Sequence, residues 1–153
     1  MAVVHVYQYF VVDSDEGAVI GGSLARARSI TLGDGEVTDQ RFKVAAETAV
    51  KLFDKSENEA MGDFDFLWLE SDRDVLIELT TDAGGDDEYF VIELKGSGTA
   101  GEFGPALVLG SDAAHQFDGT VNAFDGTEDT IDEIWVYNED TSNTARVRLV
   151  VGT

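Results

Sequence analysis

The chain has 153 residues, of which 43% are hydrophobic, and its 31 acidic residues against ten basic ones give a net charge of −21. This length and apolar content predict one folded domain with a real core rather than a disordered chain. The negative field argues against nucleic acid and anionic membranes as partners, and the absence of cysteine excludes disulfides and thiolate metal sites.

Three explanations of the acidity stay open. The surface can be adapted to a salty or divalent-rich medium, where ions screen self-repulsion. The acids can form a specific Ca²⁺ site, or they can mimic a nucleic acid backbone. Because the acidic residues are scattered over turns along the whole chain, the first explanation is favoured.

The first twelve residues, M-A-V-V-H-V-Y-Q-Y-F-V-V, predict a strand rather than a signal peptide. They lack a basic leading region and a cleavage site, so we expect a protein made in the cytoplasm without an export signal. No run is long enough to span a membrane. The strand Val3–Val12 is apolar on both faces and is therefore either central in the core or an arm (residues 1–12) that docks on a partner, with contact candidates Val4, Val6, Tyr7, Tyr9 and Phe10.

The next segments predict short strands at Ala18–Ile20 and Leu24–Leu32, separated by glycine-containing turns. Arg41–Phe53 is ambiguous. Its apolar residues fit a helix, with Asp39 as a cap, and fit an alternating strand equally well. The strand is favoured because everything downstream has a β pattern.

Two apolar runs dominate the middle of the chain, Phe64–Leu69 and Val75–Leu79, on either side of the polar connection 70–74. Both have the length and composition of strands. Since the connection is too short for a crossover helix, the two runs are predicted to pair as an antiparallel hairpin.

Five further strands are predicted after this hairpin, and a glycine-rich loop, Gly96–Pro105, follows the first of them; the strands are Glu88–Lys95, Ala106–Leu109, Thr120–Phe124, Ile131–Tyr137 and Ala145–Val151. Eight to ten short strands with little helix predict an all-β fold, a single antiparallel β-sandwich over residues 1–153. A jelly-roll-like arrangement suits the strand count, and an open Greek-key sandwich is the alternative.

The sequence carries no recognisable catalytic motif, and we expect neither an enzyme nor a cofactor. His5 lies in an apolar strand, and His115 lies in the predicted loop Ser111–Phe117 without a matched partner. There is no G-x-S-x-G elbow, P-loop or H-E-x-x-H sequence. Trp68 and Trp135 could line a carbohydrate cleft, but their strand neighbours favour packing in the core.

Two acidic clusters are candidates for Ca²⁺ binding: Asp82, Asp86, Asp87 and Glu88 first, then Asp125, Glu128 and Asp129. Neither has the spacing of an EF-hand loop. Turns are rich in Asp in any case, so a purely structural role is favoured and no metal is expected.

Half of the ten basic residues fall in one early region: Arg26, Arg28, Arg41, Lys43 and Lys51. They can form a face that docks on an acidic partner, or they can offset neighbouring acids across a sheet. Both interpretations stay open at this point.

Two stretches carry a family resemblance. Asp63–Asp112 and the ending Asp129–Val151, with I-D-E-I-W-V-Y-N followed by S-N-T-A-R-V-R-L-V-V, resemble small virion proteins of tailed phages, especially marine ones. The resemblance covers the C-terminal two-thirds and rests on strand and turn patterns. The first sixty residues take no part in it.

The resemblance implies a non-enzymatic β-sandwich attached to the virion. Head decoration (cement) proteins of this kind form homotrimers on the capsid surface, bind the major capsid protein and reinforce the shell. A head-fibre, neck or tail component is the nearest alternative, and a carbohydrate- or Ca²⁺-binding module is a second class. The expected contacts with the capsid come from the N-terminal strand and from Arg26 and Arg28.

Overall fold

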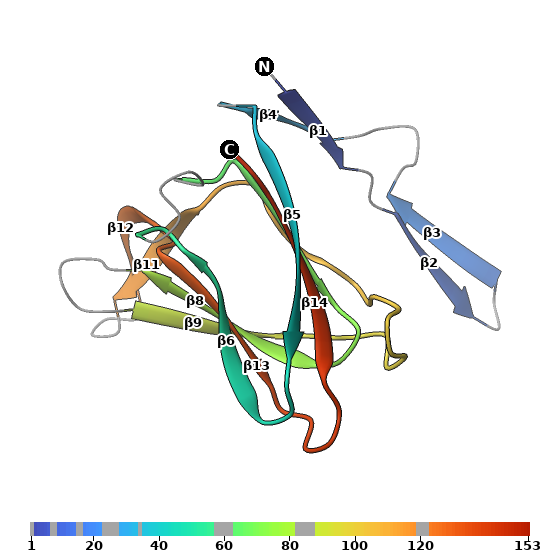
Figure 1. The fold of residues 1–153 in the computed structure, drawn as a ribbon. Coiled ribbons are helices and arrows are strands. Elements are labelled where there is room, and N and C mark those ends of the chain that lie inside the picture. Colours follow the sequence, from blue (N-terminus) through green and yellow to red (C-terminus); the bar gives the residue numbers. More distant parts are fainter. Residues whose placement is uncertain are drawn as a thin grey trace.

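The computed structural model describes residues 2–6, 9–14, 17–22, 28–33, 35–56, 63–81, 88–118 and 123–153, and all regular structure in these ranges is β-strand (Figure 1). The strands are β1 Ala2–Val6, β2 Tyr9–Ser14, β3 Gly17–Gly22, β4 Arg28–Leu32, β5 Val37–Val44, β6 Thr48–Asp54, β7 Phe66–Ser71, β8 Val75–Thr81, β9 Glu88–Leu94, β10 Leu107–Leu109, β11 Ala113–Asp118, β12 Ala123–Thr130, β13 Glu133–Asn138 and β14 Ala145–Gly152.

Two antiparallel four-stranded sheets form a β-sandwich, which confirms the predicted fold class. The first sheet has the order β10-β7-β14-β5 and the second the order β6-β13-β8-β9. Three two-stranded ribbons, β1–β4, β2–β3 and β11–β12, are added to this sandwich. The ambiguous segment 41–53 is not a helix. It is also not one strand, because a turn at 45–47 with Glu47 at φ 52° divides it between β5 and β6.

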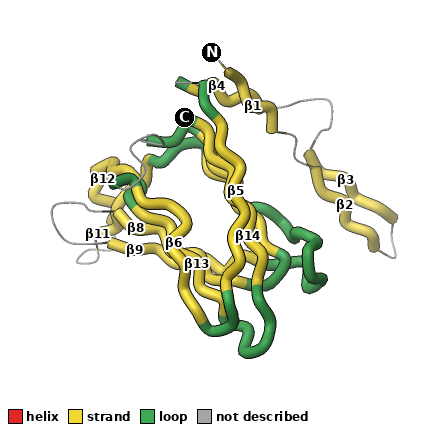
Figure 2. Tube along the Cα trace, viewed as in Figure 1, coloured by secondary structure: helices red, strands yellow, loops and turns green. Residues whose placement is uncertain are grey.

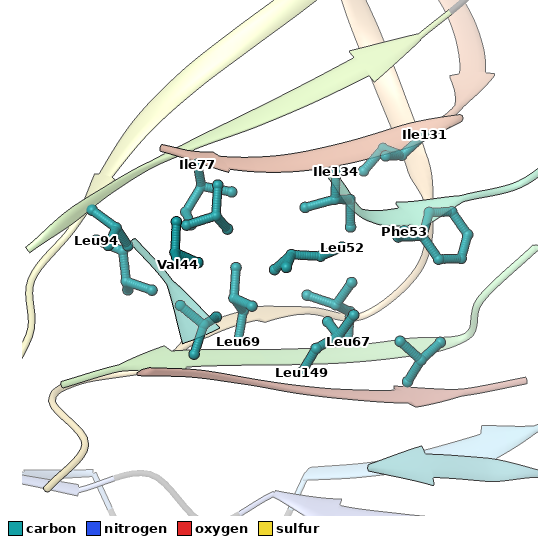
Figure 3. Packing of buried hydrophobic residues seen from close by; sticks show 14 of the residues in the cluster. Val44, Leu52, Phe53, Leu67, Leu69, Ile77, Leu94, Ile131, Ile134 and Leu149 are labelled. Carbon is teal, nitrogen blue, oxygen red and sulfur yellow. The ribbon is translucent and has the colours of Figure 1, made fainter. Parts of the chain in front are cut away.

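The core lies between the two sheets (Figure 3), and strict alternation along the strands builds it. In β14, Val147, Leu149 and Val151 are buried, as the sequence pattern predicts, while Arg146 faces solvent. The rings of Phe53 and Phe64 close one part of the core edge to face, with centroids 5.8 Å apart.

The predicted hairpin over residues 64–80 is wrong. β7 pairs with β14 and β10 in the first sheet, whereas β8 pairs with β13 and β9 in the second. The turn between them carries the chain from one sheet to the other. The buried carboxylate of Asp72 holds this corner, since it accepts hydrogen bonds from the backbone N–H groups of Arg146 (2.7 Å) and Gly101 (2.6 Å).

The expected single strand Val3–Val12 is also wrong, because β1 and β2 pair with different partners. β4 packs on the outer face of the first sheet, where the side chain of Leu32 is buried against Phe66. Gly152 makes room for it: a Cβ at this position would lie 2.9 Å from Leu32 Cδ2. The β2–β3 ribbon, in contrast, extends away from the sandwich (Figures 1 and 2).

Three further expectations need correction. His115 lies on strand β11 rather than in a loop. Of the strand expected at Thr120–Phe124, residues 120–122 lie outside the described residues, and the described part, from Ala123, continues to Thr130. Core packing is confirmed for Trp68, which packs in a second hydrophobic cluster with Leu32 and Phe66 outside the first sheet. It is wrong for Trp135, which lies on the outer face of the second sheet.

Candidate interaction surfaces

The described residues contain no group of three or more His, Asp or Glu side chains positioned to hold a metal ion. Among the Ca²⁺ candidates, Asp82, Asp86 and Asp87 lie outside the described residues, and Glu88 begins strand β9. The second acidic cluster, 125–129, lies within strand β12. No helix of the described ranges is long and apolar enough to cross a membrane.

The N-terminal contact candidates are divided between two ribbons. Val4 of β1 lies opposite Ile30 in the backbone register, and Val6 lies opposite Arg28. Tyr9 and Phe10 lie on β2, opposite Gly22 and Gly21, in the ribbon that extends from the sandwich. Tyr7 and Arg26 lie outside the described residues.

The outer face of the second sheet forms an aromatic surface, and it includes Trp135, which the sequence pattern predicted to pack in the core. A pocket of about 260 Å³ opens there, lined by Ala49, Leu76, Glu78, Val91, Trp135 and Tyr137. Two contacts fix the indole ring of Trp135: its Nε1–H donates to Glu133 Oε2 at 2.6 Å, and Lys51 Nζ lies 5.2 Å from the ring centroid. The alternation of side chains along the strand could have predicted this surface. Since Ile134 and Val136 are buried, Trp135 and Tyr137 must point to the opposite, outer face.

The edge strand β9 extends this aromatic surface. Tyr89 is 71% exposed, Phe90 is 64% exposed, and Val91 is also exposed. β9 ends its sheet and pairs only with β8 among the described strands. Residues 88–94 contain no Lys, Pro or bulge, and their charged residues are Glu88 and Glu93. Such an edge is suited to contact with another chain.

The predicted basic cluster is only partly assembled. Arg41 and Lys43 face outward on β5, where Lys43 lies opposite Arg146 of β14. A groove of about 300 Å³, lined by Arg41, Phe42, Lys43, Gly101, Phe103, Arg146 and Val147, is formed between these strands and the 96–105 loop. Lys51 lies on the other sheet, where it forms ion pairs with Asp54 and Glu133.

A paired charge cluster lies beside this groove. The Arg148 guanidinium donates to Asp39 at 3.0 and 2.8 Å and to Glu70 at 3.1 Å. These bonds raise the pKa of Arg148 above its ordinary value and hold the pKa of Asp39 below its ordinary value. Of the five basic residues grouped by sequence, Lys51 offsets neighbouring acids, through its ion pairs with Asp54 and Glu133.

Asp112 is a buried carboxyl group with an unusual titration. It is 7% exposed, and its Oδ2 has no hydrogen-bond partner. Burial, followed by the negative charge of Asp63, raises the pKa of Asp112 to about 6. Lys55 pairs with Asp63 rather than with Asp112. Two carboxyl groups alone do not supply the six to eight oxygen ligands that Ca²⁺ takes.

The chain matches no protein-family model, and no match was found among curated proteins or among solved structures.

Proposed function

We propose that this protein is a structural virion component, a capsid decoration (cement) protein that binds the major capsid protein through its N-terminal β2–β3 ribbon. The observation that supports this proposal is the β2–β3 ribbon itself. An isolated two-stranded ribbon is at best marginally stable in water, and this one extends from the sandwich with the largely apolar sequences YFVVDS and GAVIGG. A partner surface that covers the ribbon would supply the missing burial.

The strand pairing supports a jelly-roll assignment. Of the eight sandwich strands, β5 pairs with β14, β6 with β13, β7 with β10 and β8 with β9. The first strand therefore pairs with the last, the second with the second-last, and so on inward. One long antiparallel ribbon, folded over and rolled into two sheets, gives this order, and viral capsid and lectin domains use the jelly-roll architecture.

Contact between copies is the second part of the proposal. The exposed side chains of Tyr89 and Phe90 on the β9 edge favour an interface in which a neighbouring copy covers them, as in the homotrimers expected of decoration proteins. The net charge of −21 suits a particle exposed to a saline medium and disfavours DNA as the ligand.

Immunogold labelling of purified virions whose genome encodes this chain tests the proposal. We expect label over the head surface. Label confined to the neck, tail or fibres would show that the protein belongs to those structures rather than to the head surface. Particles that carry neither label nor the chain by mass spectrometry would contradict a virion role.

A glycan-binding module is the second candidate, favoured by the fixed Trp135 ring beside Tyr137 and Glu78 on an open sheet face. Aromatic faces stack on sugar rings, and neighbouring acids bond sugar hydroxyl groups. In a Trp68→Phe variant, fluorescence comes from Trp135 alone. Saturable quenching by a panel of glycans would favour this candidate, and unchanged fluorescence would remove it.

A further inference from the structure

The basic residues of this acidic protein are unevenly neutralised. Lys51, Lys55, Lys95 and Arg148 each form ion pairs with carboxylates. Arg41, Lys43 and Arg146 are exposed and form no ion pair with a described carboxylate, although the charge of Arg41 also acts on Asp39. The half-buried Arg73 likewise forms no such ion pair and donates a hydrogen bond to the carbonyl oxygen of Gly98. Since acidic residues outnumber basic ones by 31 to ten, unpaired cations are unexpected in this chain. Arg41, Lys43 and Arg146 all line the same groove.

The backbone register brings the three cations together. Lys43 and Arg146 are directly opposed on β5 and β14, and Arg41 lies two residues from Lys43 on the same face. Like charges placed directly opposite one another destabilise a sheet. A counter-charge from outside the described residues would relieve this repulsion.

The 96–105 loop, which forms one wall of the groove, is anchored to β14. The Asp72 carboxylate bonds the backbone N–H groups of both Gly101 and Arg146, so it fixes the 96–105 loop against β14. Gly101 has φ +86°, and a Cβ there would lie 2.7 Å from Arg146 Nη1. Glycine at position 101 therefore leaves the space that the guanidinium group occupies.

Two acids near the groove are already engaged, and the exposed Glu102 lies between the lining residues Gly101 and Phe103 without belonging to the lining. Asp72 is buried and bonded to two backbone amides, and Asp39 is engaged by Arg148. No carboxylate belongs to the lining, whose remaining surface is apolar, including Phe103 and Val147. The groove is thus an electropositive recess on a strongly negative protein, and such a recess concentrates anions.

We propose that this groove binds the oxyanion group of a small ligand, a carboxylate or a phosphate. Guanidinium groups donate paired hydrogen bonds to either group, and Lys43 adds a point charge from the opposite strand. The apolar lining around Phe103 accommodates the carbon portion that carries the oxyanion. The inference is independent of the virion role, because it concerns the opposite end of β5 from the N-terminal ribbons.

Titration of the ¹⁵N-labelled full chain with inorganic phosphate and with glutarate, followed by amide chemical shifts, tests the inference. Ionic strength is held constant with NaCl. We expect saturable shifts confined to residues 41–43, 101–103 and 146–147. Tighter binding of glutarate would assign a carboxylate ligand, and tighter binding of phosphate would assign a phosphate ligand.

The double variant Lys43→Gln/Arg146→Gln should weaken binding of the preferred anion about tenfold or more, since it removes the charge-assisted hydrogen bonds that these two side chains donate. Lys95→Gln is the matched control, because it removes an exposed cation that is already paired with Asp74 and Glu93. The affinity of the Lys95→Gln variant for the anion should equal that of the parent chain. Shifts that do not saturate, that spread over the whole surface, or that persist in the double variant would overturn the site.

Discussion

Asp112 shows how one buried side chain couples the stability of the fold to pH. Its folded-state pKa of about 6 is above the ordinary value of 3.8, since burial and the charge of Asp63 both disfavour ionisation. The stabilising contribution of the protonated group is therefore complete below pH 3.8 and is lost as the pH rises through about 6. At neutral pH the folded protein carries an ionised carboxylate in an unfavourable place.

Asp112→Asn should stabilise the protein at pH 8, because the amide imitates the protonated carboxyl group. We expect a gain of about 1–2 kcal/mol in the free energy of unfolding, less than the full linkage value, since Asp63 is largely exposed and its charge is screened. At pH 4 most of the gain should be absent. Urea unfolding of both proteins at the two pH values measures the difference.

Asp74→Asn is the control, because the pH dependence of its effect on stability should be opposite to that of Asp112→Asn. Asp74 accepts hydrogen bonds from Lys95 Nζ and the Gly96 backbone N–H, each at 2.9 Å, and its pKa is lowered. Its contribution is present above pH 3.8 and is lost as the pH falls below that value. This variant should lose stability at pH 8. An Asp112→Asn effect that is the same at both pH values would contradict the assignment.

At the scale of elements, the docking of the β1–β4 ribbon depends on one side chain. Leu32 is buried on the outer face of the first sheet and is accommodated by the missing side chain of Gly152. Leu32→Asp should release the ribbon and leave the sandwich folded, because the core between the sheets contains no part of β4.

Hydrogen exchange measures this release. We expect the amides of β1 and β4 to lose about tenfold or more of their protection in Leu32→Asp, while those of β14 keep theirs. Thr31→Asp serves as the control, since Thr31 is exposed on the neighbouring position of the same strand. Loss of protection throughout β14 would show instead that the ribbon is integral to the core.

Local pattern predicted most strands correctly, but it did not predict how they connect. The alternation of β14 identified its buried residues because one face of the strand meets the core and the other meets solvent. For residues 64–80 the local pattern predicts a hairpin, but a short polar connection fits two structures equally well: a hairpin within one sheet and an arch between two sheets. The contacts of Asp72 that distinguish the two lie far away in sequence, at Gly101 and Arg146.

The interaction surfaces were predicted less well, for the same reason. The basic groove needs Arg146, which is about a hundred residues from Arg41 and Lys43, so sequence proximity grouped those two with Lys51 instead. Trp135 was assigned to the core because composition alone does not tell which face of an aromatic strand is covered. Alternation with the buried Ile134 would have placed it outside.

At the scale of the whole molecule, the net charge of −21 makes self-repulsion the dominant long-range term. The Debye length falls from about 30 Å at 0.01 M salt to about 3 Å at 1 M. Raising NaCl over this range at pH 7 should therefore raise the melting temperature by roughly 5 °C or more, since about 1 kcal/mol shifts it by a few degrees. A melting temperature that falls would mean that the attractive ion pairs outweigh the repulsion.

The central claim is that the β2–β3 ribbon attaches the sandwich to its partner. Because Val6 and Arg28 are register partners in β1 and β4, a two-residue Asn-Gly turn can replace residues 7–27 and keep the β1–β4 pairing. Circular dichroism and thermal melting of this variant would establish that the sandwich is retained.

Co-sedimentation of the full chain and the ribbon-deleted variant with capsids stripped of the protein tests the claim most directly. We expect saturable binding of the full chain and a loss of affinity of about a hundredfold or more in the folded variant, equivalent to roughly 2.7 kcal/mol. Equal binding of the two proteins would contradict attachment through the ribbon, and binding of neither would contradict the capsid as the partner.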